Sequence, residues 1–556
     1  MAADHLSLPD PDAHPDTTAL DGVLFIMCDQ LRWDALSCYG GIVDTPNLDR
    51  LAARGVRFDR AYVQGTTCGS SRMSYYTGRY VQTHGTRYNQ VPLSVKERTL
   101  GDHLRDNDVR TVLIGKTHMR ADAEGMSRLG LDPDDPRCVY LAECGFEPAE
   151  RDDGLWPDER VSPDLPYNRF LRERGFDVPN PWHAVANSVV DEDGETISGW
   201  LLRSSPYAAI VPDELSESAY MVDRTIDFIR SAVDERWCVH LSFIKPHWPY
   251  VVSSPWHEHI DPADLPRAQR SQGERETDHR VLRGFQESRI GRTFSEDHVR
   301  HAVMPAYLGL VKQIDHHLGR LFAELERLGR ADSTMVVLCS DHGDYLGDHW
   351  QGEKDWFHEA AVRTPMIIAD PRPSADATRG TDTDALVQAI DLAPTFVEAL
   401  GGALDNASPW LEGVSLMPTL EGRGVRQEQV ISESDYGFLE FASLLPDTGR
   451  TRDDRATMIR TDRYKYILCE NAPNLLYDLE DDPDEFVDRA GDPALASVEH
   501  DLHERLFEWF RRRAHDTTYD DPIVRRRRAY GEVARQGIVI GYWDEAALER
   551  GIAGDV

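Results

Sequence analysis

Gly22-Val-Leu-Phe-Ile-Met-Cys28, followed directly by Asp29-Gln30, is the stretch of sequence that decides the fold. A continuous apolar run of this length, ending abruptly in polar residues, is typical of a strand covered on both faces in a parallel sheet. The same pattern returns in Thr334-Met-Val-Val-Leu-Cys339, which is followed by Ser340-Asp341-His342. Two such strands predict an α/β protein with a large, mostly parallel central sheet flanked by helices.

Amphipathic segments between the apolar runs predict the flanking helices. Tyr307 to Leu328 has apolar residues every three or four positions, Ser216 to Val233 is interpreted as a second helix, and Thr45-Pro46 suits the start of a third. Further strands are expected at Arg110–Gly115 and Trp237–Phe243. Open α/β sheets bind ligands at the carboxyl ends of their strands, so this edge is where a site is expected.

The chain has 556 residues, which exceeds one ordinary core and predicts several structural units. Residues 1–20, rich in Asp, Pro and His, are predicted to be a flexible leader. Residues 21–430 form the predicted catalytic α/β domain, within which the Pro- and Asp-rich residues 120–212 are interpreted as insertion loops. Residues 431–514 are predicted to form a smaller C-terminal α+β subdomain, and residues 515–556 a tail that contacts other subunits.

The charge excludes some classes of function. The chain has 97 Asp and Glu against 61 Lys and Arg, a net charge of −36. Such an acidic surface argues against a nucleic-acid binder, which needs basic groups to displace counterions from phosphates. No apolar run approaches the ~20 residues of a membrane span, and the N-terminus lacks the features of a signal peptide. We therefore expect a cytoplasmic protein with neither nucleic-acid nor membrane partners.

The spacing of the cysteines gives no sign of stabilisation by disulfides or by structural zinc. The eight cysteines are scattered without C-x-x-C pairs, so neither a disulfide framework nor a structural zinc site is expected.

The first candidate for chemistry is Cys68-Gly-Ser-Ser-Arg72. We expect a polar loop from Gln64 to Ser71 that leads into a helix at Met73–Thr77. Near a helix N-terminus, the macrodipole and the free N–H groups favour an anionic nucleophile and an anionic substrate. Taken alone, a loop cysteine with an exposed arginine remains the simpler interpretation.

The second candidate is a metal site. Asp29-Gln30 and Asp341-His342 each follow an apolar strand at the edge where ligands are expected. Carboxylate and imidazole groups from two strand ends suit a divalent cation. Asp and His also cap turns and helices, so a single pair would be weak evidence, but two pairs at one edge favour a metal.

The third candidate is a set of cationic side chains: Lys116 and His118, Lys245 and His247, and Lys354. Lys and His two positions apart on an extended segment face the same way. A lone lysine is usually solvated. Together with a metal and Arg72, however, these groups describe a pocket for a tetrahedral oxyanion, in which charges stabilise the transition state.

These motifs, in this order, resemble the sulfatase family of the alkaline phosphatase superfamily, close to the branch of phosphonate monoester hydrolases and related cytoplasmic arylsulfatases. The resemblance extends from Val23 to about Asp492. Its pieces are Cys28-Asp-Gln-Leu-Arg-Trp-Asp34, Thr45-Pro-Asn-Leu-Asp-Arg-Leu51, Cys68–Arg72 with Thr77-Gly78, Gly115-Lys-Thr-His118, Lys245-Pro-His-Trp-Pro249, Ser340-Asp-His-Gly-Asp-Tyr-Leu-Gly-Asp348, Arg463-Tyr-Lys-Tyr-Ile467 and Leu476-Tyr-Asp-Leu-Glu-Asp-Asp-Pro-Asp-Glu485. Each piece is weak alone, but their order and spacing are specific.

The resemblance implies a hydrolase of sulfate monoesters. It implies that a formylglycine-generating maturation enzyme oxidises Cys68 to formylglycine, whose hydrate supplies the nucleophilic oxygen. It also implies one divalent metal ion, calcium or manganese. Its ligands would be Asp29, the modified residue 68, Asp341 and His342, with Gln30 adjacent.

The resemblance further assigns roles to charged and polar side chains around the nucleophile. Arg72 would orient residue 68. The ester oxyanion would be bound, and the leaving group assisted, by Lys116, His247 and Lys354. His118 is the candidate base that releases sulfate, and Asn89 falls where phosphonate hydrolases have a substrate-contacting Asn.

Two positions depart from the family pattern. Ser70 stands where the cysteine signature usually has Pro, and Lys116 and His118 stand where the phosphonate branch tends to have Tyr and Thr. Because a sulfate monoester strongly needs leaving-group assistance, the Lys-x-His pair favours sulfate esters. The alternatives are a phosphonate monoester or phosphodiester hydrolase with the same nucleophile and metal, and an inactive binding protein with Cys68 unmodified.

The C-terminal tail suggests self-association. It contains Arg525 to Arg528 in an otherwise acidic chain. Such a run is commonly a solvated surface, and it also suits contact with an acidic partner subunit. We predict a homo-oligomer, with a dimer favoured over a tetramer.

Overall fold

The computed structural model describes residues 19–154, 165–404, 410–424, 427–439, 441, 454–513 and 545–553. The predicted leader, residues 1–20, lies almost wholly outside the described residues. So does the predicted tail, residues 515–556, apart from helix α18. The roles predicted for these two segments therefore stay predictions.

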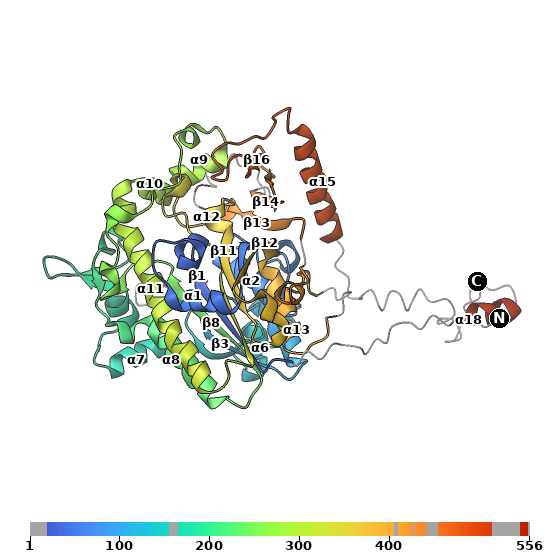
Figure 1. Ribbon diagram of the computed structural model, residues 1–556, viewed down its shortest axis with the longest axis horizontal. Helices are drawn as coiled ribbons and strands as arrows, with labels where there is room; N and C mark the ends of the chain where they lie inside the picture. Colours follow the sequence, from blue (N-terminus) through green and yellow to red (C-terminus); the bar gives the residue numbers. More distant parts are fainter. Residues whose placement is uncertain are drawn as a thin grey trace.

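An eight-stranded sheet forms the centre of the molecule (Figure 1). Within the described residues, its pairings are parallel except for the two that β11 makes with β10 and β2. The expectation of a mostly parallel sheet is confirmed. In spatial order the strands are β12 (Thr381–Gln388), β2 (Val56–Tyr62), β11 (Arg363–Ala369), β10 (Thr334–Ser340), β1 (Gly22–Asp29), β8 (Trp237–Pro246), β3 (Arg110–Gly115) and β4 (Glu147–Arg151).

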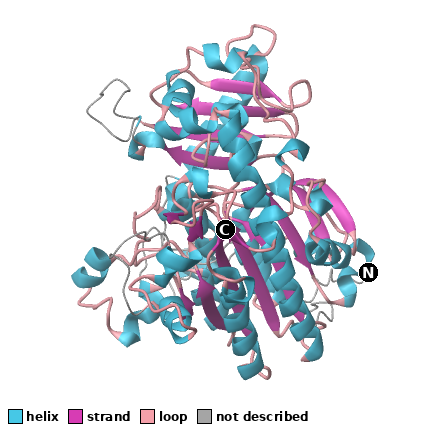
Figure 2. Cartoon of the chain, turned by 90° about the vertical axis from the view of Figure 1, so that its left-hand side faces the viewer, coloured by secondary structure: helices cyan, strands magenta, loops and turns pink. Residues whose placement is uncertain are grey.

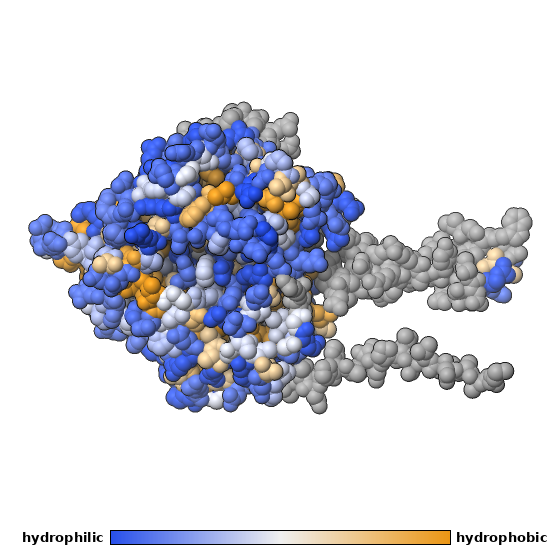
Figure 3. Space-filling model, turned by 45° about the horizontal axis from the view of Figure 1, so that its top comes forward, coloured by the Kyte–Doolittle hydropathy of each residue, from blue (hydrophilic) through white to orange (hydrophobic). Residues whose placement is uncertain are grey.

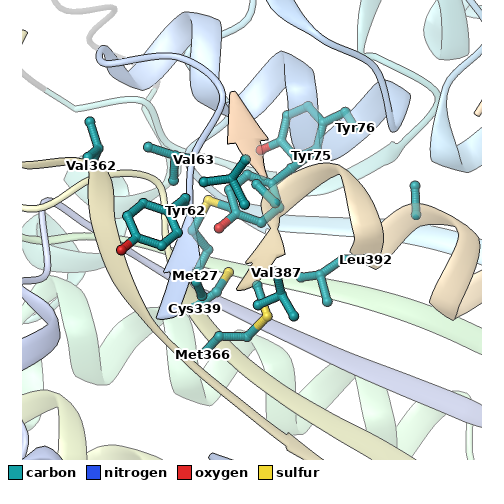
Figure 4. Close-up of a cluster of buried hydrophobic side chains, with 14 of the residues drawn as sticks. Met27, Tyr62, Val63, Tyr75, Tyr76, Cys339, Val362, Met366, Val387 and Leu392 are labelled. Atoms are coloured by element: carbon teal, nitrogen blue, oxygen red, sulfur yellow. The ribbon is translucent and has the colours of Figure 1, made fainter. Parts of the chain in front are cut away.

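The apolar run of β1 is continuous because both faces of the strand are covered. Alternate side chains point to opposite sides of the sheet. Phe25 and Met27 join one core cluster, whereas Leu24 and Ile26 join the other, and all are fully buried. Figure 4 shows Met27 among side chains of neighbouring strands and helices. The run therefore has the composition that a central strand requires.

Helices cover both faces of the sheet. In Figure 1, α8 and α11 lie on one side and α13 on the other. Side chains of α1 (Pro46–Arg54), α8 (Glu217–Ser231) and α11 (Asp297–Arg327) belong to one core cluster, and those of α2 (Cys68–Thr77), α4 (Leu100–Arg105) and α13 (Leu392–Ala399) belong to the other. The helix expected at Tyr307–Leu328 begins earlier, at Asp297, and contains Pro305.

The connections contain short elements. Their helices are α3 (Val81–His84), α5 (Ala123–Arg128), α6 (Val139–Ala142), α7 (Pro166–Glu173), α9 (Arg280–Glu287), α10 (Arg289–Phe294), α12 (Glu359–Val362) and α14 (Met417–Leu420), while α18 (Glu545–Ala553) belongs to the C-terminal tail. A small sheet has the order β6 (Thr196–Ser198), β5 (Ser188–Val190), β7 (Ala208–Ala209) and β9 (Val252–Ser253). Residues 120–212 are thus more regular than the insertion loops we expected. They supply β4, an edge of the central sheet, because an edge strand needs pairing on one side only.

A smaller antiparallel sheet lies above the central one in Figure 2. Its strands are β13 (Val430–Asp435), β14 (Arg455–Arg460), β15 (Tyr464–Cys469) and β16 (Leu475–Asp478). One face packs against α15 (Ala496–Arg513), where Leu506 and Trp509 meet Ile459. The expected small C-terminal sheet with a following helix is confirmed.

The face shown in Figure 3 is mostly hydrophilic, with small separate hydrophobic areas. This agrees with the large excess of acidic residues in the chain. Among the described helices, none has the length and hydropathy needed to cross a membrane.

Candidate active site

The carboxyl ends of β1 and β10 bring the two acidic motifs together. The strands are parallel neighbours, with Cys28 opposite Ser340. Asp29 ends β1, and Asp341 and His342 directly follow β10. The Ser340 hydroxyl donates to the Cys28 carbonyl and accepts from Leu31 N at 2.9 Å, so it ties the two strand ends to each other.

Helix α2 begins at Cys68 itself, before the helix start we expected at Met73. The first turn is helical because Asn89 supplies a cap from outside. Its Oδ1 accepts a hydrogen bond from Gly69 N at 2.7 Å, which satisfies one of the free amides of the helix start. Cys68 therefore lies at the positive end of the helix dipole and is fully buried.

Four side chains form a compact cluster of possible metal ligands: Asp29, Cys68, Asp341 and His342. Their ligand atoms all lie within 4.8 Å of one another. The sulfur of Cys68 is 3.1 Å from His342 Nε2 and 3.7 Å from Asp29 Oδ1. His342 Nε2 is 3.8 Å from Asp341 Oδ1.

The chemistry of this cluster fits a divalent cation. His342 Nδ1 lies 2.8 Å from the Gly343 carbonyl, which can only accept, so Nδ1 donates and Nε2 directs its lone pair into the cluster. Two carboxylates and an imidazole are ligands that hard or borderline divalent cations accept. Asp341 and the Cys68 charge, against the effect of burial, raise the pKa of His342 to about 9, so metal binding would displace its proton.

Arg72 holds the two carboxylates. Its Nε donates to Asp341 Oδ2 at 2.8 Å and its Nη2 donates to Asp29 Oδ2 at 3.1 Å, while Nη1 donates to the Lys116 carbonyl. All of these side chains are fully buried. The guanidinium thereby places two ligands of the cluster at once, and its influence on residue 68 passes through them.

Two lysines bring positive charge to the cluster. Lys116 Nζ forms an ion pair with Asp29 Oδ2 at 2.5 Å. Lys354 Nζ lies 3.0 Å from Gln30 Oε1 and 3.0 Å from His247 Nε2. Because an ammonium group only donates, His247 Nε2 accepts. His247 Nδ1 then donates to the Trp248 carbonyl at 2.8 Å, which leaves the ring neutral.

The pKa values reflect this charge pattern. Burial opposes ionisation of Cys68, but the charges of Lys354, His342 and Lys116 hold the pKa of its thiol well below the usual range. Burial, and then the charge of Lys354, lower the pKa of His247 to about 3. The site is therefore built to stabilise negative charge at residue 68.

His118 and Asn89 lie on the more open side of the cluster. Both are half-buried, whereas the metal-ligand candidates and Lys354 are buried. A hydrogen bond from His118 also helps to lower the pKa of Cys68, so the His118 ring lies close to the Cys68 side chain. Since Asn89 Oδ1 accepts from Gly69 N, the Asn89 amide donors remain for a ligand.

Lys245 lies elsewhere, contrary to the expectation that it faces the same way as His247. Its Nζ donates to Asn187 Oδ1 at 3.0 Å and to the Pro249 carbonyl at 2.7 Å. The alternation rule fails because the register of β8 against β1 shifts near Pro246. Lys245 is thus part of the structural framework behind the site.

A second group of possible ligands, Asp213, His316 and His317, is better explained by hydrogen bonding. Arg320 Nη1 lies 3.2 Å from His317 Nδ1, which must accept, so His317 Nε2 carries its proton toward Asp213 Oδ1 at 3.2 Å. The same oxygen accepts from Trp256 Nε1 at 2.8 Å. A protonated Nε2 is not a metal ligand.

Sequence reasoning missed two supporting carboxylates. Asp344 Oδ2 accepts from Gln30 Nε2 at 2.5 Å and from Tyr250 Oη at 2.7 Å, which turns Gln30 Oε1 toward Lys354. Asp153 Oδ1 accepts from His118 N at 2.8 Å. Asp344 stands inside the quoted Ser340–Asp348 motif, which was a usable signal, whereas nothing in the local sequence marks Asp153.

Comparison with known proteins agrees with this geometry. A family model described as Sulfatase matches residues 22–403, more than half of the chain. The chain belongs to the sulfatase family. A second model, described as N-sulphoglucosamine sulphohydrolase, C-terminal, matches residues 347–512, which include the C-terminal sheet and α15 of this sulfatase-family protein.

Relatives of this sulfatase-family protein include both sulfate and phosphonate hydrolases. The multifunctional alkaline phosphatase superfamily protein PehA of Trinickia caryophylli is 29% identical over 88% of this chain and 94% of its own. The choline-sulfatase of Rhizobium meliloti is 28% identical over 86% of this chain and 84% of its own. The phosphonate monoester hydrolase of Agrobacterium radiobacter superposes with a TM-score of 0.75 at 26% identity, over 88% of this chain and 96% of its own. The protein is thus a hydrolase of the alkaline phosphatase superfamily, similar to phosphonate monoester hydrolases.

Proposed function

We propose that this protein is a metal-dependent hydrolase of sulfate monoesters, arylsulfatase-like, with a formylglycine nucleophile made from Cys68. The observation that supports this most directly is the position of Cys68. It is the first residue of α2, its sulfur lies 3.1 Å from His342 Nε2, and it belongs to the candidate metal cluster. A modified residue 68 would present an oxygen at the same place.

The metal is proposed to be one calcium or manganese ion. Asp29, the modified residue 68, Asp341 and His342 would hold it, with Gln30 adjacent. Bound there, it would polarise the ester oxygens and lower the pKa of the nucleophile. Carboxylates suit calcium, and the imidazole of His342 suits manganese.

The other side chains are proposed to act on charge and protons. Lys116 and Lys354 neutralise the oxyanion, and Arg72 keeps the two carboxylates in place. The pair of Lys354 and His247 meets the leaving oxygen, to which Lys354 can donate a proton.

Release of the product is proposed to begin at His118. Formylglycine hydrate has a second hydroxyl, and its deprotonation lets the bond to sulfate break while the aldehyde is restored. His118 is the proposed base, since an unprotonated imidazole nitrogen can accept a proton. Asn89 is proposed to donate a hydrogen bond to the bound ester.

Phosphonate monoesters and phosphodiesters are the second candidate substrates. The similarity to phosphonate monoester hydrolases and to the multifunctional PehA favours them, and the nucleophile and metal would be the same. Lys116 and His118 favour sulfate instead. A third candidate, an inactive binding protein, requires that Cys68 stays unmodified.

The first experiment is mass spectrometry of the tryptic peptide Ala61–Arg72, using protein from a host able to mature sulfatases. Formylglycine replaces sulfur and two hydrogens of Cys68 by one oxygen. Finding this species with Ser70 in place supports the proposal. Finding only intact Cys68 in such a host would refute the proposed formylglycine mechanism.

The second experiment compares kcat/KM on aryl sulfates and aryl phosphonates that share one leaving group. We expect hydrolysis of both, with sulfate preferred, loss of activity after metal chelation, and recovery with calcium or manganese. Cys68→Ala is the inactive control. A phosphonate preference of several orders of magnitude would make the second candidate the function.

The cellular setting is also proposed. A formylglycine-generating enzyme is the maturation partner, the protein is cytoplasmic, and it forms a homodimer, or alternatively a tetramer, through residues 515–556. The domain boundaries stay at 21–430 and 431–514. Light scattering of a chain truncated after residue 514 tests the role of the tail, since an unchanged mass would refute it.

A further inference from the structure

A cavity of about 330 Å³ lies between α1 and α11, at the end of the central sheet remote from the candidate active site. Its floor includes Thr334 and Val336 of β10, and Ala369 of β11, which pairs with Val336. The candidate metal ligands follow the other end of β10, after Ser340. At about 3.3 Å per residue, the strand separates the cavity from these ligands by roughly 20 Å. A ligand in the cavity therefore does not reach the cluster around residue 68.

The cavity exists because α1 and α11, which lie side by side in Figure 1, are in close contact at one end only. At that end, Asn47 Nδ2 donates to Asp315 Oδ2 at 2.9 Å, and a Cβ on Gly319 would lie 2.5 Å from Asn47 Oδ1. At the other end, long side chains bridge the helices, since Arg54 Nη1 pairs with Glu326 Oε1 at 2.9 Å. The apolar side chains that line the space between the helices are Leu51, Phe322 and Leu325.

A buried hydroxyl group at the floor of the cavity has no partner. Thr334 is 1% exposed, and its Oγ1 meets no hydrogen-bond partner among the residues that the structure describes. Side chains two apart on a strand share a face of the sheet, so Thr334 points, like Val336, toward the helices that enclose the cavity. A buried hydroxyl without a partner costs free energy, which a ligand with a polar group at its inner end would offset.

The rim of the cavity has one positive charge that no carboxylate offsets. Three ion pairs neutralise the other charged side chains that line it: Arg54–Glu326 at 2.9 Å, Arg372–Asp370 at 2.8 Å and Arg379–Asp376 at 2.8 Å. Arg50 is exposed, and its Nη2 donates to Asn47 Oδ1, which holds it at the rim. Within the described ranges Arg50 forms no ion pair, so its remaining N–H groups are available to an anion.

We propose that this cavity binds a small carboxylic acid with an apolar body, its carboxylate at Arg50 and a hydrogen-bonding group at Thr334. The apolar lining would bury the body of such a ligand, and a guanidinium group matches a carboxylate in charge and in geometry. The site is separate from Cys68, and the inference does not depend on the proposed function.

The first test concerns the charge at the rim. Calorimetry on the full-length chain compares 2-naphthoate with the neutral 2-naphthamide. We expect 2-naphthoate to bind at least fivefold more tightly, and Arg50→Gln to remove most of this preference. The matched control Arg128→Gln, which alters an exposed arginine of α5, should keep it. Equal binding of both compounds to the wild type, or of neither, would overturn the proposal.

The second test concerns the hydroxyl at the floor. We expect 6-hydroxy-2-naphthoate to bind at least fivefold more tightly than 2-naphthoate, and Thr334→Val to abolish this difference. Thr111→Val is the control, since it alters another buried threonine with an unpartnered hydroxyl, on β3. A difference that survives Thr334→Val would contradict the proposal.

A blocking variant separates the cavity from the metal cluster, the other place where an anion would bind. Ala323 is exposed and lines the cavity, so Ala323→Trp should fill its mouth and weaken binding of 2-naphthoate at least tenfold. Thermal melting checks that each variant folds. Undiminished binding to folded Ala323→Trp would place the ligand elsewhere and refute the assignment. Because these measurements need no catalysis, their outcome is independent of whether any ester is hydrolysed.

Discussion

At the scale of single residues, a carboxylate behind the site sets the conformation of the proposed base. His118 has a left-handed backbone, with φ of 54°. Its N–H and that of Thr117 both donate to Asp153 Oδ1 at 2.8 Å, and Arg151 Nε donates to Asp153 Oδ2 at 2.8 Å. The carboxylate thus offsets the cost of an uncommon backbone conformation. Asp153 is a positioning residue for His118.

We expect Asp153→Ala to lower kcat by roughly ten- to one-hundredfold, since a lost hydrogen bond to a charged group is worth about 1.5–3 kcal/mol. KM should fall together with kcat, so that kcat/KM changes little, because His118 is proposed to act after the ester is cleaved. Asp153→Asn keeps an acceptor and should be milder. Steady-state kinetics with Asp122→Ala as control, which removes a comparable cap from Gly125 N, checks this. An effect confined to KM would argue against the positioning role.

At the scale of elements, the start of α2 depends on close contact with the segment that contains Asn89. Gly69 allows this contact. A Cβ there would lie 2.9 Å from Asn89 Oδ1 and 3.2 Å from Asn89 Cα, closer than carbon atoms normally approach. The helix therefore begins at Cys68 because the second residue has no side chain and an external oxygen caps it.

Gly69→Ala should displace Asn89, remove the cap and cost about 1 kcal/mol of unfolding free energy. Activity should fall as well, because residue 68 and Asn89 both shift. Gly273→Ala is the matched control, since the nearest atom to its added Cβ is 3.9 Å away. Thermal melting and kcat/KM measure both effects. If the two alanine variants behave alike, the contact has no importance for the helix start.

At the scale of the whole molecule, the C-terminal sheet supports the segment that contains Lys354. Lys465 of β15 is fully buried and its Nζ donates to the Phe357 carbonyl at 2.7 Å. The same ammonium pairs with Glu485 at 2.5 Å and with Glu359 at 2.9 Å. The small sheet is therefore joined to the catalytic body by a buried charge cluster.

Lys465→Met should reduce the unfolding free energy by about 3–5 kcal/mol, because it leaves the buried carboxylate of Glu485 without its charge partner. It should also lower kcat/KM, since the neighbouring segment places Lys354. Adding Glu485→Gln should recover part of the stability. Arg463→Met, which removes partly exposed ion pairs just before β15, is the control and should cost at most about 1 kcal/mol. Equal losses for the two single variants in chemical denaturation would contradict this account.

The core also makes stability depend on pH. His240 of β8 is fully buried, its Nε2 lies 2.9 Å from Tyr76 Oη, and its Nδ1 donates to the Phe25 carbonyl. Burial, and then the charge of Arg72, lower the pKa of His240 from 6.5 to about 3. Between these values the unfolded chain binds more protons than the folded one, so this contribution to stability is lost as the pH falls.

His240→Gln removes this titration. The stability difference between wild type and variant should be largest above pH 6.5 and should shrink by up to about 1.4 kcal/mol per pH unit as the pH falls toward 3. Denaturant titrations at several pH values measure it. A difference that does not vary with pH would mean that His240 titrates equally in both states.

Much of the central sheet could be predicted from sequence. Strands β1 and β10 can be recognised from sequence because both faces of each strand are buried, which makes the apolar run continuous. β12 begins with exposed polar residues at the sheet edge, and β4 is also an edge strand, so neither has such a run. These strands are specified by pairing with a neighbour rather than by their own composition.

The sequence by itself determined the fold class, the family and the chemistry-bearing motifs around Cys68, Asp29 and Asp341, because strand patterns and short motifs are local in the chain. Only the tertiary structure decided which side chains meet. Asp29 and Asp341 are adjacent because β1 pairs with β10 in one register, and Lys245 is excluded because β8 shifts its register near the site. The supporting carboxylate of Asp153 likewise reaches His118 only through packing. Such contacts depend on long-range pairing, which no local pattern specifies.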